Sequence, residues 1–419
     1  MAEKGLPCLC FCARGDWINR LYVPVHSGGT ENFMDCFVKA SYGVMWHFYH
    51  NRHGICFCKM RDEKITEYQV LLPDARDDFD VTTDDSDVIH LVCQNTDGDI
   101  IYVNHRDGEW KKATVLKSKR STSYSKDFVI RRIGNWLNLF YCIEYNGNRM
   151  LTHQILERDD VSPFVIDCIK DVFCAAQDGL GNIYLLFYSE TKKSYGVRRY
   201  VWSQKNWEEF VPYEQLDGAK KPYLYIDGED KIHIIFEIDG CIKHLCDGKT
   251  EILGAGASPI MMFQRNLIYM WEGLNDNKIY IRHPEDRSPT VFMPGGFSKP
   301  ARMRLRYTSF EPDINADLCL GNISDGSVKT YGIKNFFNVS QTPPSIVPQQ
   351  AAAHSRPDGN GAYIELQKLK IQLGQLENAL EKLQSGISGL DVQRIEKRLA
   401  ELEETVDKRV KNKLFSWFL

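Results

Sequence analysis

Five arginines lie where several guanidinium groups could meet. Arg302, Arg304 and Arg306 alternate along one predicted strand, and Arg131 and Arg132 lie together in another. Alternate side chains of a strand share a face, so the first three groups point the same way. Guanidinium groups bind carboxylates and other anions through paired hydrogen bonds. The pattern predicts either a binding site for an anion, a carboxylate or an acidic peptide, or ion pairs with neighbouring parts of the fold.

The cysteines offer a second possible site. Cys8, Cys10 and Cys12 alternate on an extended segment, and Cys56 and Cys58 repeat that spacing. Converging thiolates can hold a soft metal ion, but structural zinc sites prefer two residues between paired cysteines. We therefore expect free thiols, no metal ion and no cofactor. The total of 13 cysteines is odd, and most lie in apolar strand-like segments, which is typical of reduced, buried thiols.

Aspartates and histidines recur along the chain. Asp84, Asp178 and Asp227 lie in predicted turns, while His90 and His233 lie in the strands that follow. Carboxylates in such turns can bind calcium or form an acid/base pair, but aspartate also hydrogen-bonds the backbone of its own turn. We interpret the aspartates as turn formers and the histidines as structural groups that bind a neighbouring turn.

The chain lacks the sequence signatures of several enzyme classes. It has no Gly-rich phosphate loop, no Gly-x-Ser-x-Gly elbow and no His-Glu-x-x-His helix, so we assign no catalytic residue. The formal net charge is -4, so no global field favours nucleic acid or an anionic membrane. No apolar stretch approaches the roughly 20 residues of a membrane span, and no signal peptide is evident. A cytoplasmic protein is expected.

The elements that position these residues form a repeat. Each copy has an apolar strand, a turn rich in Asp, Gly and Asn, a strand carrying His or Tyr, a hairpin, and often a last strand that opens with Trp. The clearest copy spans residues 79–116, and a second spans residues 171–207. His47 holds the place of the two histidines above in its own copy. We count seven copies, the last one degenerate near residues 316–320.

This repeat predicts a fold. Short strands of β-branched and aromatic residues, separated by Asp-Gly and Asn-Gly turns, indicate antiparallel hairpins. Four-stranded units bury their faces by stacking on one another, and a radial arrangement avoids a long exposed edge. Residues 15–335 resemble the broad β-propeller superfamily of sialidase-like and tryptophan-aspartate-repeat folds. The resemblance implies an all-β propeller of about seven four-stranded antiparallel blades.

The resemblance is one of architecture. Neither a regular Gly-His to Trp-Asp signature nor a complete Asp box is present, so no family's activity is carried over. In this architecture the innermost strands line a central channel, where the arginines would lie. The last copy supplies at most three strands, and we expect residues 17–25 to complete it.

The C-terminal part of the sequence has a different character. Residues 338–361 form a linker rich in Pro, Gln, Ala and Gly, and residues 362–415 are predicted to form a coiled coil or a helical hairpin. Apolar residues spaced alternately by three and four give a heptad seam for oligomerisation. The seam consists of Leu366, Leu369, Leu373, Leu376, Leu380, Leu383, Ile387 and Leu390. Gly386 and Gly389 then interrupt the pattern, so a helical hairpin remains an alternative to a continuous coiled coil.

The expected domains are an N-terminal segment over 1–14, a β-propeller over 15–337, the linker and helical tail above, and an apolar C-terminus over 416–419. Together they predict a non-catalytic binding or scaffold protein. The head would bind a protein or glycan partner, and the tail would form a homo-oligomer that multiplies weak contacts. The alternative is a sialidase-like or lyase-like carbohydrate-active enzyme, which would need an acid and a base to converge.

Overall fold

A computed structural model of the chain describes residues 35–40, 44–61, 64–84, 86–119, 124–133, 136–157, 162–264, 266–274, 276, 278–293, 301–307, 314–324 and 327–331. The chain divides into two compact units, Met1–Ser345 and Ile346–Leu419, and every described residue belongs to the first. The expected coiled coil, Cys8, Cys10, Cys12 and residues 17–25 lie outside the described residues, so what the sequence predicts for them stays a prediction.

The first half of the described chain consists of short antiparallel strands in succession. They are β1 (Asp35–Lys39), β2 (Met45–Asn51), β3 (Gly54–Arg61), β4 (Lys64–Leu72), β5 (Ala75–Thr83), β6 (Ile89–Asn95), β7 (Ile100–Arg106), β8 (Glu109–Leu116), β9 (Val129–Ile133), β10 (Trp136–Tyr145), β11 (Asn148–Ile155), β12 (Phe164–Ile169), β13 (Cys174–Gln177), β14 (Ile183–Ser189), β15 (Ser194–Val201), β16 (Asn206–Trp207) and β17 (Val211–Pro212). A short 3₁₀ helix, η1 (Glu214–Leu216), follows.

The second half continues in the same way. Its strands are β18 (Lys220–Ile226), β19 (Ile232–Ile238), β20 (Cys241–Cys246), β21 (Lys249–Ala255), β22 (Ala257–Gln264), β23 (Asn266–Glu272), β24 (Ile279–Arg282), β25 (Thr290–Phe292), β26 (Ala301–Tyr307), β27 (Ile314–Asn315), β28 (Leu318–Ser324) and β29 (Ser327–Tyr331). Consecutive strands pair in runs such as β5-β6-β7-β8 and β18-β19-β20-β21. Each run is one hairpin meander, as the short polar turns require.

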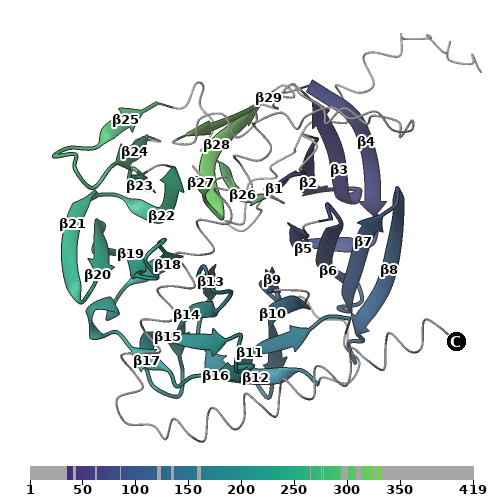
Figure 1. The fold of residues 1–419 in the computed structure, drawn as a ribbon, viewed down its shortest axis with the longest axis horizontal. Helices are drawn as coiled ribbons and strands as arrows, with labels where there is room; N and C mark the ends of the chain where they lie inside the picture. Colours follow the sequence, from purple (N-terminus) through teal and green to yellow (C-terminus); the bar gives the residue numbers. More distant parts are fainter. Residues whose placement is uncertain are drawn as a thin grey trace, which may run out of the picture. The chain divides into compact units, whose positions relative to one another are not determined.

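These runs are arranged radially around a centre, as the blades of a propeller (Figure 1). The first strand of each run lies nearest the centre, and first strands of neighbouring runs contact one another, as β5 does β9 and β13 does β18. The predicted β-propeller is therefore confirmed, and the described residues are all-β apart from η1. None of the described helical segments is long and apolar enough to cross a membrane.

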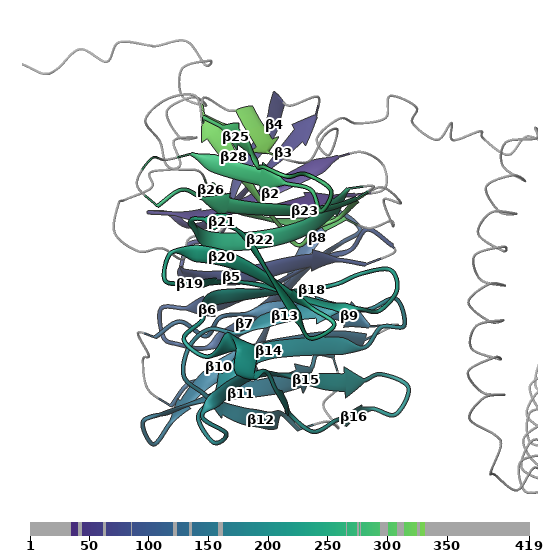
Figure 2. The same ribbon diagram turned by 90° about the vertical axis from the view of Figure 1, so that its left-hand side faces the viewer.

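The hydrophobic core lies between the faces of adjacent blades. Val81 and Leu91 of β5 and β6 belong to one buried cluster with Phe48 and Phe57 of β2 and β3. A second cluster joins β14 to β18 and β19, which lie near each other in the side view (Figure 2). Each blade thus buries its two faces against its two neighbours, so the blades depend on one another for their stability.

The ring is closed in the described residues by its innermost strands. β1 and β26 pair in parallel, with Asp35 opposite Met303 and Lys39 opposite Tyr307. This pairing joins β1-β2-β3-β4 and β26-β28-β29 into one sheet of seven strands. This pairing is not predictable from the sequence, because a parallel pair between strands more than 260 residues apart leaves no local pattern. β29 is the last strand of this sheet on its side among the described residues.

Candidate functional site

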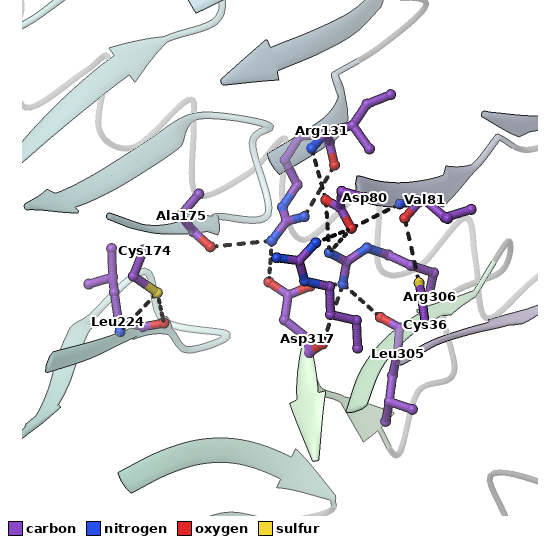
Figure 3. Close-up of polar contacts among 12 residues, drawn as sticks. Cys36, Asp80, Val81, Arg131, Cys174, Ala175, Leu224, Leu305, Arg306 and Asp317 are labelled. Carbon is purple, nitrogen blue, oxygen red and sulfur yellow. Dashed lines mark hydrogen bonds and ion pairs between the residues drawn. The ribbon is translucent and has the colours of Figure 1, made fainter. Parts of the chain in front are cut away.

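The predicted arginines lie on the two strands expected to carry them, close to the centre of the ring. Arg131 comes from β9, and Arg304 and Arg306 come from β26. Figure 3 shows Arg131 and Arg306 pointing toward Asp80 of β5 and Asp317, which lies between β27 and β28. We call Arg131, Arg304, Arg306, Asp80 and Asp317 the central cluster.

Asp80 is the fully buried member of the central cluster. Its carboxylate accepts hydrogen bonds from the amide of Val81 at 2.9 Å and from that of Ile130 at 3.0 Å. Its Oδ1 also lies 3.1 Å from Arg304 Nη1 and 3.3 Å from Arg306 Nη2. Burying an ionised carboxylate is tolerated only when charge and hydrogen bonds compensate, and both do so here.

Asp317 is the second carboxylate, and it bridges two blades. Its Oδ2 lies 2.6 Å from Arg131 Nη2, and its Oδ1 lies 3.1 Å from Arg306 Nη1. The side chain is 39% exposed, against 0% for Asp80. One face of the Asp317 carboxylate is therefore open to solvent, whereas Asp80 is enclosed.

Electrostatics in the central cluster favour the charged forms. Burial alone would raise the pKa of Asp80, but the three guanidinium groups, led by that of Arg306, hold this pKa below its ordinary value. Burial would lower the pKa of Arg306, while the charges of Asp80 and Asp317 raise it above its usual range. Burial raises the pKa of the neighbouring Cys36 thiol to about 12, so this cysteine is protonated at neutral pH.

The other two arginines have separate surroundings. Arg302, further along β26, lies 3.7 Å from Glu272 of β23 and donates to the carbonyl of Ser258. Arg132 follows Arg131 directly, so its side chain leaves the opposite face of β9. Of the two interpretations left open by the sequence, the structure shows ion pairs with other blades for Arg131, Arg302, Arg304 and Arg306.

Sequence reasoning missed both carboxylates of the central cluster. Asp80 lies between Phe79 and Val81 in a strand, and Asp317 lies between Ala316 and Leu318. An aspartate flanked by apolar residues is expected to be buried, and a buried carboxylate needs a cation or hydrogen-bond donors as partners. The apolar neighbours of Asp80 and Asp317 could therefore have marked them as candidate site residues. The sequence could not say which arginine each would meet.

The turn aspartates do what the sequence predicted. Asp227 Oδ1 accepts the amides of Glu229 and Lys231, each at 2.8 Å, while Oδ2 lies 3.0 Å from His233 Nε2. Asp84 with His90 and Asp178 with Tyr184 repeat this arrangement. His47 has a different partner. Its Nε2 lies 3.2 Å from the carboxylate of Asp35, which belongs to strand β1 and not to a turn.

The described residues also show where the remaining candidate ligands lie. Cys56 Sγ contacts Asn51 and Tyr68, and Cys58 Sγ lies 3.8 Å from His47 Nδ1. No group of three or more His, Cys, Asp or Glu side chains suited to a metal ion occurs in the part of the chain that the structure describes.

A groove of about 550 Å³ lies where the blades β9–β12 and β13–β16 meet. It is lined by residues 147–150, 168–170 and by Glu190, Thr191 and Lys193. Here β12 pairs with β14 through Ile169 and Ser189, and the amide of Glu190 donates to Cys168 O at 2.8 Å. β11 also pairs with β12 through Arg149–Ile169 and Met150–Cys168, so hydrogen-bonded backbone joins all three lining segments and fixes their spacing.

Six of the ten residues that line this groove carry a polar or charged side chain. Arg149, Lys170 and Lys193 are cationic, and Glu190 is the single carboxylate among the lining residues described. Glu190 Oε2 accepts from Lys193 Nζ at 2.5 Å, and Arg149 pairs with Asp127. Sequence reasoning missed the groove, because its residues come from three separate connections and share no motif.

Comparisons with known proteins do not assign this chain to a family. No family model matches the sequence, and no curated protein matches it. An ulvan lyase from a new family of polysaccharide lyases is similar at TM-score 0.44 and 11% identity, covering 72% of this chain and 95% of that chain.

Two further solved structures are similar to this chain at comparable TM-scores and sequence identities. A six-bladed fungal lectin from Aleuria aurantia has TM-score 0.39 and 9% identity, over 63% of this chain and 97% of that chain. The Hadza microbial sialidase has TM-score 0.38 and 11% identity, over 57% of this chain and 63% of that chain. The fold assignment rests on the strand order and pairing of the chain itself.

Proposed function

We propose that this chain is a non-catalytic binding protein with a propeller head of seven blades and an oligomerising tail. The blades begin at β1, β5, β9, β13, β18, β22 and β26, and their regular strand order supports this count. The last blade has β26, β28 and β29, and residues 17–25 are proposed as its fourth strand. The head binds a protein or glycan partner.

The groove between the blades β9–β12 and β13–β16 is the observation that carries this proposal. Its volume of about 550 Å³ falls in the range of small-ligand sites. Asn148, Arg149, Lys170, Glu190 and Thr191 supply hydrogen-bond donors and acceptors along it. Such a lining suits a ligand rich in hydroxyl groups, so we favour a glycan as the occupant.

The same lining argues against the enzyme alternative. Glycoside hydrolysis commonly uses two carboxyl groups that flank the bond to be broken. Glu190 is the only carboxylate among the described lining residues, and Lys193 already binds it. The groove is therefore equipped to hold a ligand rather than to exchange protons with it.

The tail raises the avidity of the head in this proposal. The heptad seam from Leu366 to Leu390 would bring several heads together, so weak single contacts add up. The central arginines are a second candidate for ligand binding, favoured by the exposed carboxylate of Asp317, which an external anion could replace.

A glycan array with a turnover assay tests the proposal. Purified full-length protein should retain at least one glycan and should release no cleavage products, as judged by mass spectrometry. The double variant Lys170→Gln/Lys193→Asn should lose roughly tenfold in affinity, since two solvent-exposed polar contacts are removed. Cleavage of the retained glycan would establish the enzyme alternative.

A matched control is available at two lysines outside the groove. Lys193 and Lys205 both lie in turns with positive φ, at 55° and 51°, and at opposite ends of β15. Lys249 lies at the start of β21 in another blade, and Lys205→Asn combined with Lys249→Gln removes two positive charges outside the groove. This control should bind like the wild type. Equal losses in both double variants would mean that the groove is not the binding site.

A further inference from the structure

We propose that Arg131 and Arg306 form a receptor for a carboxylate side chain of a partner peptide, and that Asp317 fills this receptor in the present structure. The inference goes beyond the groove and does not depend on glycan binding. It concerns a second site, at the centre of the ring.

The two guanidinium groups converge on a single carboxylate from different blades (Figure 3). Arg131 Nη2 binds one oxygen of Asp317 at 2.6 Å, and Arg306 Nη1 binds the other at 3.1 Å. The two arginines are only 9% and 8% exposed, so their charges are poorly screened by water. A buried pair of this kind binds a carboxylate through charge-assisted hydrogen bonds.

Neighbouring groups hold both arginines in place independently of the Asp317 side chain. Arg131 donates to the carbonyls of Ile130 and Ala175 at 3.2 and 3.3 Å. Arg306 donates to the carbonyl of Leu305 at 2.9 Å and to Asp80. The receptor is therefore preorganised, and a ligand would meet little cost of ordering it.

The charges of the central cluster require a second carboxylate. Asp80 is fully buried and bound by two backbone amides, so it is a permanent part of the fold. It faces three guanidinium groups and can neutralise one of these charges. Asp317 supplies the next negative charge from a side chain that is 39% exposed.

The Asp317 side chain can be exchanged without breaking a strand. Its residue lies outside β27 and β28, and its carbonyl oxygen accepts the amide of Leu305 at 2.9 Å. Rotation of the side chain alone would vacate the receptor while this backbone bond remains. An aspartate or glutamate of a partner would then present the same group that Asp317 presents now, which is why we assign the ligand to an acidic peptide.

The experiment compares the wild type with Asp317→Ala in the full-length protein. The probes are sodium acetate, sodium chloride at equal ionic strength, and the peptide acetyl-Gly-Asp-Gly-amide. Acetate should raise the thermal midpoint of Asp317→Ala and leave the wild type unchanged, whereas chloride should do neither. The peptide should bind Asp317→Ala at least tenfold more tightly than the wild type, because the internal competitor is gone. Asp276→Ala, which removes an exposed surface carboxylate, should show no response to acetate.

Several results would overturn the inference. One is an equal response of Asp317→Ala to acetate and chloride, which would show general screening. Another is an unchanged peptide affinity in Asp317→Ala, and a third is binding of glucuronate as tight as that of the peptide. If Asp317→Ala does not fold, Asp317→Asn keeps the side-chain volume and should still bind the peptide more tightly than the wild type.

Discussion

At the scale of single residues, the molecule is organised by buried charges that find partners far away in the sequence. Asp80 meets Arg306 across 226 positions, and Arg131 meets Asp317 across 186. Each contact joins residues of different blades, so ion pairing contributes to holding the ring together. Removing one partner of such a buried pair is costly, because the other charge stays buried and unpaired.

Asp80→Asn tests this role. We expect a loss of about 3 kcal/mol in the free energy of unfolding, measured by urea denaturation at pH 7, since Arg304 loses its ion pair with Asp80 and Arg306 loses one of its two carboxylate partners. Asp107→Asn, in an exposed turn with φ of 54°, should stay within about 0.5 kcal/mol of the wild type. Because the folded pKa of Asp80 is lowered, its contribution is present above about pH 4 and is lost as the pH falls. A wild-type-like stability of Asp80→Asn would contradict the assignment.

At the scale of elements, one local device recurs between the first two strands of several blades. In three such turns an aspartate accepts the amides two and four residues further on and binds the side chain six residues further on. Asp178 is an enclosed example, with a side chain only 1% exposed. Because the device satisfies backbone donors that have no ladder partner, it sets where the second strand begins.

Asp178→Ala should therefore destabilise the fold by about 2 kcal/mol, because the amides of Leu180 and Asn182 would both lose their acceptor. The thermal midpoint of the full-length protein would measure this loss. Asp171→Ala, at an exposed position just before β13, is the control and should leave the midpoint close to that of the wild type. Comparable midpoints for the two variants would show that the Asp178 turn is not structurally important.

At the scale of the whole molecule, we propose that the head binds the ligand and that the tail sets the oligomeric state. The head buries its core between blades, so we expect it to fold without the tail. The tail has its own signal, a seam of leucines from Leu366 to Leu390.

Replacing Leu373 and Leu380 with Asp should convert the protein to a monomer, as light scattering on the purified chain would show. Burying a carboxylate in an apolar seam costs several kcal/mol per ion. The two substitutions also remove two leucines from the interface, so we expect the free energy of association to become unfavourable. Asn378→Asp with Ser385→Asp adds the same two charges at outer heptad positions and should keep the wild-type assembly. A monomeric wild type at micromolar concentration would contradict the proposal and would favour the hairpin folded at Gly386 and Gly389.

The sequence by itself determined the strands, the turns and their repeat, because hydrophobic alternation and turn chemistry act over a few residues. It also showed that Arg302, Arg304 and Arg306 share one face of a strand. Only the tertiary structure decided what that face meets, since Asp80 and Asp317 reach the arginines when blades distant in sequence come together. The parallel pairing of β1 with β26 arises in the same way. It depends on how the ring closes, and closure is a property of all the blades at once that no short segment encodes. The groove depends on how two consecutive blades pack side by side, which brings three separate segments together.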